Sequence, residues 1–342
     1  MGIARHFGLG VGRLAPGHNN AITDVPGVLV GHKTILADGL ATGVTAVLPH
    51  GDDLFKSKVR AAVEIINGFG KSAGLMQLAE LGAIETPILL TNTFSVAPCV
   101  EALIKRAIAA NPEIGRETST VNPVVCECND GSINDIQAMA VARQDAEAAL
   151  DAASVGPVEQ GSIGAGAGMT SFGFKAGIGS SSRHVKIEDR GFTLGALVLS
   201  NFGRAGDLIL PDGRMADPKG LSPPESGSII IILGTDIPLG DRQLNRVARR
   251  AGAGIARLGS YWGHGSGDIA IAFTTADPLP HVPSSPFSSM ARLDDRHIDP
   301  VFEAVVEATA EAVLNAMCAA ESVVGRNGRR FPALSEWLRE RG

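Results

Sequence analysis

The chain has 342 residues, of which 44% are hydrophobic and 19% charged, a balance typical of a globular protein with a sizeable core. Its formal net charge of −6 provides no basic surface for nucleic acid, and the charges are interspersed, which leaves no patch for a membrane surface. No apolar run is long enough to span a bilayer and no signal peptide is visible, so we expect a cytoplasmic protein whose four cysteines stay reduced.

The first 200 residues alternate between strand-like and helical patterns. Apolar runs predict strands at residues 27–34, 43–48, 87–90 and 195–200. The run at 61–66 fits either a strand or the end of a helix. Apolar residues at helical spacing predict helices at 72–81, 100–110 and 134–153.

The next segment carries the functional prediction. Residues 202–227 are polar and rich in Gly and Pro, which predicts a long exposed connection. The connection ends at Ser228-Ile-Ile-Ile-Ile-Leu233, whose lack of alternation predicts a strand covered on both faces. Beyond it we predict a helix at 241–258, a strand at 268–274, and a helix capped by Asp299 that runs to about residue 320.

The junction Gly227-Ser228 suits cleavage of the chain by its own serine. Gly227 has no Cβ, so it can adopt strained backbone angles and leaves its carbonyl open to the Ser228 hydroxyl. Cleavage would free an α-amine, with an unperturbed pKa of about 8, on the residue that bears the hydroxyl. Nucleophile and base would then share one residue. A Gly-Ser pair alone fits a plain turn before a strand better, so this prediction needs support from elsewhere.

Three other polar groups are candidates for supporting roles. In His264-Gly-Ser-Gly-Asp268, Asp268 can orient Ser266 toward Ser228, or the segment is a Gly-rich turn before a strand. Glu127 follows a strand-like run and can pair with a substrate ammonium group, or it is a solvated charge at a strand end. Asn201 ends a strand and can donate to an oxyanion, or it closes a turn.

The motifs typical of cofactor and metal sites are absent from the sequence. The segment before Gly70-Lys71-Ser72 lacks the first glycine of a P-loop, and residues 164–168 do not form GxGxxG. There is no HExxH and no pair of histidines at ligand spacing. We therefore expect neither a metal nor a cofactor.

The chain resembles the DmpA/BapA family of L-aminopeptidase/D-Ala-esterase-amidase and β-peptidyl aminopeptidase enzymes. The similarity extends over nearly the whole chain, and several blocks occur together in the family's order. They are residues 20–28, 66–71, 86–92, 161–168 and 177–183, then Gly227-Ser228 with Thr235-Asp236, and Gly265-Ser-Gly-Asp268.

This resemblance implies a four-layer α/β/β/α sandwich, similar to the Ntn-hydrolase fold but with different connectivity. It implies one catalytic domain over residues 1–342, cleaved into an α chain (1–227) and a β chain (228–342), and assembled as a homotetramer of such pairs. The implied roles are the nucleophile for Ser228, its supporting pair for Ser266 and Asp268, the oxyanion donor for Asn201, and binding of the substrate's amino group for Glu127. Some members have a Tyr near Asn129 that contributes to the oxyanion site, and this chain lacks it.

The function predicted is therefore a self-processing aminopeptidase or amidase acting on short peptides, amino-acid amides or esters. Two alternatives stay open: an acyltransferase of the ornithine acetyltransferase type on the same fold, and an uncleaved relative that binds without turnover. The sequence does not decide among α-L-, D- and β-amino-acid substrates.

Overall fold

Two β-sheets stack face to face in the computed structural model, which describes residues 2–219 and 226–341. The smaller sheet has the order β1-β2-β5-β6, formed by Leu29–Ala37, Leu40–Leu48, Ile88–Asn92 and Val124–Cys128. The larger sheet has the order β4-β3-β14-β13-β10-β9, formed by Ala83–Ile84, Ser57–Gly68, Gly265–Pro280, Ser226–Thr235, Arg190–Asn201 and Ile178–Ile187.

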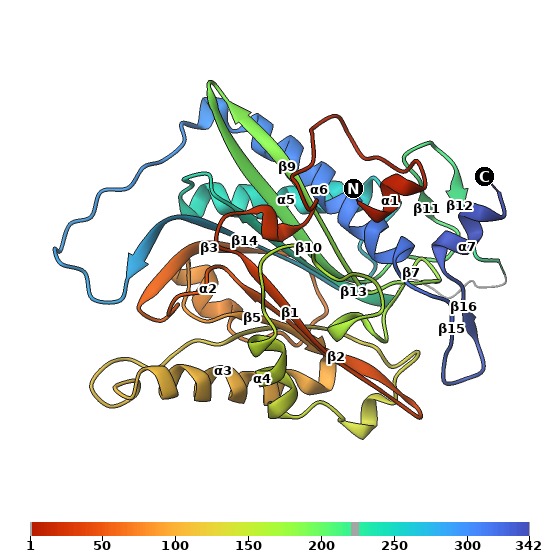
Figure 1. Cartoon of the computed structure of the whole chain (residues 1–342), viewed down its shortest axis with the longest axis horizontal. Coiled ribbons are helices and arrows are strands. Elements are labelled where there is room, and N and C mark those ends of the chain that lie inside the picture. Colours follow the sequence, from red (N-terminus) through yellow and green to blue (C-terminus); the bar gives the residue numbers. More distant parts are fainter. Residues whose placement is uncertain (1, 220–225, 342) are drawn as a thin grey trace.

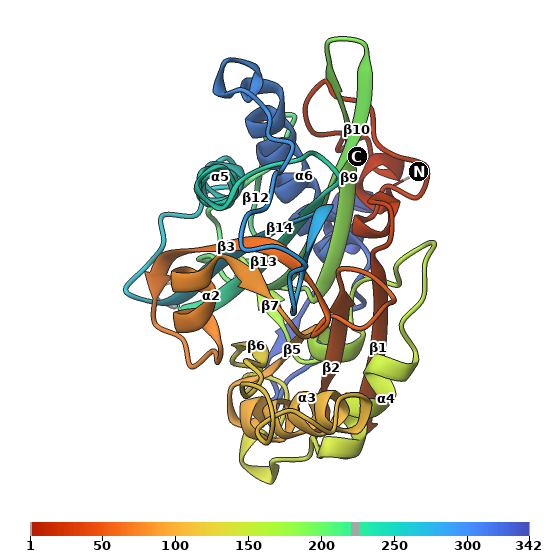
Figure 2. The ribbon, with the colours of Figure 1, turned by 90° about the vertical axis from the view of Figure 1, so that its left-hand side faces the viewer.

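Two pairs of helices cover the outer faces of these sheets (Figure 1). Helices α3 (Val96–Ala110) and α4 (Arg143–Asp151) pack on the smaller sheet, and α5 (Asp241–Ala256) and α6 (Asp299–Cys318) pack on the larger one. Figure 2 shows the same stack from the side. The four-layer α/β/β/α sandwich expected from the sequence is therefore confirmed.

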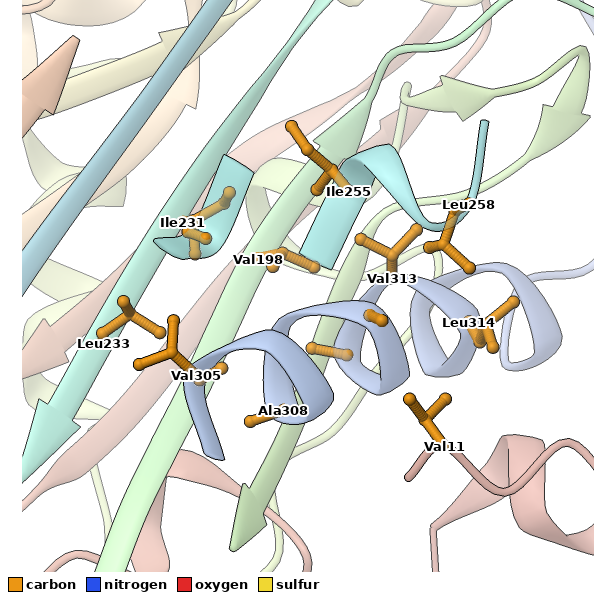
Figure 3. Packing of buried hydrophobic residues seen from close by; sticks show 14 of the residues in the cluster. Val11, Val198, Ile231, Leu233, Ile255, Leu258, Val305, Ala308, Val313 and Leu314 are labelled. Carbon is orange, nitrogen blue, oxygen red and sulfur yellow. The ribbon is translucent and has the colours of Figure 1, made fainter. Parts of the chain in front are cut away.

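Each interface between layers has its own apolar core, and β13 contributes to two of them. Ile230 and Ile232 face the smaller sheet, whereas Ile229, Ile231 and Leu233 face α5 and α6 (Figure 3). All five side chains are at most 1% exposed. Burial of one such side chain stabilises the fold by about 1.5–3 kcal/mol, which explains the unbroken apolar run.

The topology around β13 brings distant segments together at one point. Strand β13 pairs in parallel with β14, through the crossover helix α5, and antiparallel with β10. In this register Ser228 lies opposite Asn201 on one side and Gly267 on the other. The beginning of β13 is therefore the place where the candidate residues meet.

Most predicted elements are present, and the ambiguous run at 61–66 belongs to strand β3. The helix predicted at 134–153 is wrong in its first half, where a short 3-10 turn (Ile136–Ala138) ends at Met139 in the left-handed conformation and α4 begins only at Arg143. Asp299 is the first residue of α6 rather than its cap, which is Ile298.

The connection predicted at 202–227 is only partly exposed. Its described part forms the hairpin of β11 (Leu208–Ile209) and β12 (Met215–Ala216), in which Leu208, Leu210 and Ala216 are buried. Residues 220–225 lie outside the described residues. Strand β13 begins at Ser226, so Gly227-Ser228 lies within the strand rather than at a loop–strand junction.

The described part of the chain also contains smaller elements. They include α1 (Ile3–His6), α2 (Leu75–Leu81), α7 (Leu334–Arg339), and the hairpins β7–β8 (Thr170–Ser171, Phe174–Lys175) and β15–β16 (Val323–Val324, Arg330–Phe331). Short 3-10 helices lie at Ile22–Asp24, Thr93–Ser95, Gly164–Gly166 and Asp295–His297. None of the helices within the described ranges is long and apolar enough to cross a membrane.

Candidate active site

Ser228 is held at the beginning of β13 between its two neighbouring strands. Its Oγ accepts a hydrogen bond of 3.1 Å from the backbone N–H of Gly267 in β14. The side chain is 6% exposed and lines a pocket, so a molecule in that pocket can reach the hydroxyl. An N–H donor on the hydroxyl oxygen stabilises negative charge that develops there.

Gly227 is glycine because the neighbouring strand passes too close for a side chain. A Cβ at this position would lie 2.1 Å from the carbonyl oxygen of Asn201. The backbone of Gly227 is not in the left-handed region, so strained angles are not the reason for this glycine. The prediction of strained backbone angles at Gly227 is therefore wrong, whereas the close approach of the Asn201 backbone requires a residue without a side chain.

Ser266 and Asp268 form a buried pair on β14. Ser266 Oγ donates to Asp268 Oδ1 at 2.6 Å, and neither residue is exposed. The register sets Ser266 opposite Gly227, the residue whose carbonyl Ser228 would attack. The four residues Gly265–Asp268 belong to the strand itself, so the alternative of a turn before the strand is wrong.

Asn67 holds this segment in place and was missed by the sequence analysis. Its Nδ2 donates to the carbonyl oxygens of Gly263 at 3.0 Å and His264 at 3.4 Å, and also to that of Ser266. A bulge in the β3–β14 pairing lies immediately after Asp268. The only signal was its place in the 66–71 block, because a pairing some 200 residues along the chain is invisible to local patterns.

Glu127 is a buried carboxylate at the end of β6. It is 3% exposed, and its Oε1 accepts from the N–H of Lys71 at 2.8 Å while Oε2 accepts from the Thr93 hydroxyl. The alternative of a solvated charge at a strand end is therefore wrong. The sequence analysis assigned neither Thr93 nor Lys71 a role at the site, although Lys71 ends the 66–71 block and belongs to the broken P-loop pattern.

The Asn201 side chain is fixed by a bond at each end of its amide. Oδ1 accepts from the N–H of Thr170 at 3.0 Å, and Nδ2 donates to the carbonyl oxygen of Asn129 at 2.9 Å. Asn129 is exposed, and its own Oδ1 accepts from the N–H of Gly131 at 2.9 Å. Asn129 thus orients Asn201 through its backbone carbonyl and is itself one of the residues that line the pocket.

One pocket of about 550 Å³ brings these groups together, a size suited to a small organic ligand. Five candidate residues line it: Glu127, Asn129, Asn201, Gly227 and Ser228. Phe69, Lys71, Thr93, Ile136 and Asn327 contribute further to its walls. Ser266 and Asp268 are not exposed, so they support the site from beneath rather than contact a ligand directly.

The model of Peptidase family S58 matches residues 20–331. The chain belongs to this family. Three relatives illustrate what this S58 chain is similar to. Beta-peptidyl aminopeptidase BapA of Sphingosinicella microcystinivorans is 36% identical over 341 aligned positions, and the alignment covers 92% of this chain and 85% of the relative.

Two solved structures are similar to this S58 peptidase over almost its whole length. The PH0078 protein from Pyrococcus horikoshii OT3 is 45% identical, with a TM-score of 0.92 over 99% of this chain and 98% of the other. The L-aminopeptidase D-Ala-esterase/amidase from Ochrobactrum anthropi, described as a new variant of the Ntn hydrolase fold, is 37% identical, with a TM-score of 0.89 over 98% of each chain. The Ntn-hydrolase-like fold and the family resemblance are confirmed, and an aminopeptidase or amidase function is favoured over acyl transfer.

The cysteines of this S58 peptidase are unsuited to act as nucleophiles. All four are buried thiols, and burial raises the pKa of Cys126 to about 12, so this thiol stays protonated at neutral pH. Within residues 2–219 and 226–341, no group of three or more His, Cys, Asp or Glu side chains is placed to hold a metal ion. Ser228 lines the pocket beside Glu127, together with the hydroxyl-bearing residues Thr93, Ser132 and Thr170.

Proposed function

We propose that this S58 peptidase is a self-processing aminopeptidase or amidase whose nucleophile is Ser228. The proposal rests mainly on one observation: the Ser228 hydroxyl lines the same pocket as the buried carboxylate of Glu127 and bonds a backbone N–H. A nucleophile beside a fixed negative charge suits amide substrates that carry a free amine. The expected products of processing are residues 1–227 and 228–342.

In processing, Ser228 Oγ attacks the carbonyl carbon of Gly227. The Oγ–C bond forms as the C–N bond of the peptide breaks, and the hydroxyl proton passes to the departing nitrogen. Water then hydrolyses the ester, which leaves a carboxylate on Gly227 and a free α-amine on Ser228. The Gly267 N–H and the Ser266–Asp268 pair support this step from β14, since they lie opposite the reacting residues.

In turnover, Glu127 binds the substrate ammonium group and so orients the neighbouring carbonyl toward Ser228. The α-amine of Ser228 or the Ser266 hydroxyl takes the proton, and Oγ attacks the carbonyl carbon. Asn201 Nδ2–H stabilises the negative oxygen of the tetrahedral intermediate, while Asn129 lines the wall beside it. The leaving amine departs with the proton, and water releases the acyl group from Ser228.

The substrates proposed are short peptides, amino-acid amides and amino-acid esters. The names of the relatives cover β-peptidyl, L-amino and D-alanyl substrates. A panel of β-homoamino-acid, L- and D-aminoacyl p-nitroanilides would rank these classes. For the whole protein we further propose a cytoplasmic homotetramer of cleaved chain pairs, which sedimentation and fractionation would test.

The direct test is the number of chains in purified protein. We expect two bands on a denaturing gel, of 227 and 115 residues, and N-terminal sequencing of the shorter band should begin with Ser228. Ser228→Ala should give one band and no hydrolysis of any p-nitroanilide, whereas Ser285→Ala, in an exposed segment, should behave as the wild type. Active wild-type protein with Met1 or Gly2 as its only N-terminus would contradict the proposal.

A further inference from the structure

Lys175 is a buried lysine that the site described above does not use. It ends the β7–β8 hairpin, is 1% exposed, and donates from Nζ to three carbonyl oxygens: Ala176 at 2.6 Å, Met169 at 3.0 Å and Gly166 at 3.1 Å. Burial lowers the pKa of Lys175 to about 7, so its ammonium form depends on these acceptors. Only the ammonium form has an N–H for each of the three oxygens. A lysine is rarely fully buried unless its ammonium group is paired, because loss of hydration is costly.

The Gly-rich block at 161–168 contains the Gly166 oxygen and leads directly to Met169, which provides a second one. A Cβ on Gly166 would lie 2.4 Å from the backbone nitrogen of Ile178, and one on Gly168 would lie 2.4 Å from the carbonyl oxygen of Ala41. Close backbone packing therefore requires glycine at both positions. The carbonyl oxygens of Gly166 and Met169 both accept from the Lys175 ammonium group, which gives the block a structural role that its sequence did not indicate.

A single peptide group connects Lys175 to Asn201. The carbonyl oxygen of Met169 accepts from Lys175 Nζ, and the N–H of the same peptide, which belongs to Thr170, donates to Asn201 Oδ1 at 3.0 Å. Peptide groups are planar, so fixing the oxygen also fixes the direction of the N–H. The path from Nζ to the Asn201 amide consists of two hydrogen bonds and one rigid unit.

We propose that Lys175 is a positioning residue that orients and polarises the Asn201 amide toward the oxyanion. A cation at the Met169 oxygen draws electron density along the peptide, which strengthens its N–H as a donor to Oδ1. This bond in turn makes Nδ2–H a stronger donor. One Nδ2 hydrogen bonds the Asn129 carbonyl, and the other serves the substrate. The inference rests on the proposed role of Asn201, and it explains why a charge is buried outside the pocket.

A double-mutant cycle tests this coupling. We measure kcat and KM on one p-nitroanilide for the wild type, Lys175→Met, Asn201→Ala and the double variant. Asn201→Ala should lower kcat by about 10²–10³-fold, as loss of one oxyanion donor does. Lys175→Met should lower kcat by about 10–100-fold with KM within twofold, because it removes only part of the roughly 10²–10³-fold effect of the Asn201 donor. The double variant should be no slower than Asn201→Ala, because both changes remove one interaction.

Controls separate positioning from general stability. Lys58→Met removes a partly buried lysine that pairs with Glu85 away from the pocket, so it should lower thermal stability without changing kcat. If Lys175→Met does not fold, Lys175→Gln, which keeps two N–H donors, replaces it in the cycle. Two results would overturn the role of Lys175 but not that of Asn201. One is a loss of kcat in the double variant equal to the product of the two single losses, and the other is an unchanged kcat in the Lys175 variant. An unchanged kcat in Asn201→Ala would overturn the proposed oxyanion role and the inference together.

Discussion

At the scale of single residues, Glu127 shows how burial turns a common side chain into a recognition group. The Lys71 N–H and the Thr93 hydroxyl occupy one position on each carboxylate oxygen. A carboxylate can accept more bonds than these two, and the remaining positions suit an ammonium group in the pocket. Two donors from separate segments also fix the plane of the carboxylate, so it presents its charge in one direction.

Glu127→Gln should therefore weaken binding of substrates with a free amine. The amide keeps the size of the side chain but loses the charge-assisted bond, which is worth about 1.5–3 kcal/mol, so KM should rise about 10–100-fold. The change in kcat should be smaller, because Ser228 and Asn201 are untouched. Initial rates on an aminoacyl p-nitroanilide measure both constants.

Glu64→Gln is the matched control for this substitution. Glu64 pairs with Arg249 at the surface of β3 and does not line the pocket, so its KM should equal that of the wild type. An equal rise in KM for both variants would show that Glu127 has no special role in binding the amine.

At the scale of elements, the approach of β3 to β14 decides where Ser228 lies. A Cβ on Gly267 would meet the carbonyl oxygen of Phe69 at 2.6 Å and Ser228 Oγ at 3.1 Å. Gly267→Ala should push the two strands apart, at a cost of about 1–3 kcal/mol typical of overpacking. It should also lengthen the bond from the Gly267 N–H to Ser228. We expect slower chain cleavage, measured as the fraction of uncut chain on denaturing gels over time, together with a lower melting temperature.

Gly191→Ala is the corresponding control within the same sheet. A Cβ there meets nothing within 4 Å, and its backbone is not in the left-handed region. Its cleavage should match the wild type. If Gly267→Ala were cleaved just as fast, then the distance between β14 and Ser228 would not control the reaction.

The sequence predicted those elements whose signal is local. The run at 229–233 revealed a strand buried on both faces, and Ser228 and Glu127 stood at the ends of apolar runs. Asn67 and Lys175 were missed because their importance comes from partners that only the folded chain brings near. The helix predicted at 134–153 fails in its first half because the Asn134 side chain bonds other groups: Nδ2 donates to Asp130 Oδ1, and Oδ1 accepts from the Ala41 N–H. Side-chain bonds to other segments outweighed helical spacing there.

At the scale of the whole molecule, buried charges join the two proposed fragments. Arg183 of β9 bonds Glu307 at 3.0 Å and Glu311 at 2.7 Å, both on α6, and all three side chains are at most 3% exposed. Arg5 of the N-terminal segment bonds Glu311 from the other side at 2.7 Å. Both arginines precede residue 227 and both glutamates follow it. After cleavage at 227–228 these bonds would hold separate chains together.

This network predicts a loss of stability in acid. Burial alone would raise the pKa of Glu311. The net effect is a pKa below the usual value, because Arg5 and Asn20 donate hydrogen bonds to the carboxylate and Arg183 adds its positive charge. A carboxyl with a lowered pKa in the folded state stabilises that state fully above its unfolded pKa of about 4.3. The contribution disappears as the pH falls through the folded pKa, since the protonated form no longer pairs with the arginines. The free energy of unfolding should therefore decrease below about pH 4.5.

Glu311→Gln should make the free energy of unfolding less dependent on pH and show how much the charged carboxylate contributes to stability. At pH 7 the variant leaves Arg183 with one carboxylate, and breaking such a buried pair costs about 3–5 kcal/mol. Between pH 5 and pH 3 its stability should change less steeply than that of the wild type, because one titrating group is gone.

Urea unfolding followed by tryptophan fluorescence, in a Ser228→Ala background that keeps one chain, measures both effects. Glu303→Gln, which breaks the surface pair with Arg13, should keep the wild-type slope, and an equal slope in Glu311→Gln would show that the network does not govern acid unfolding.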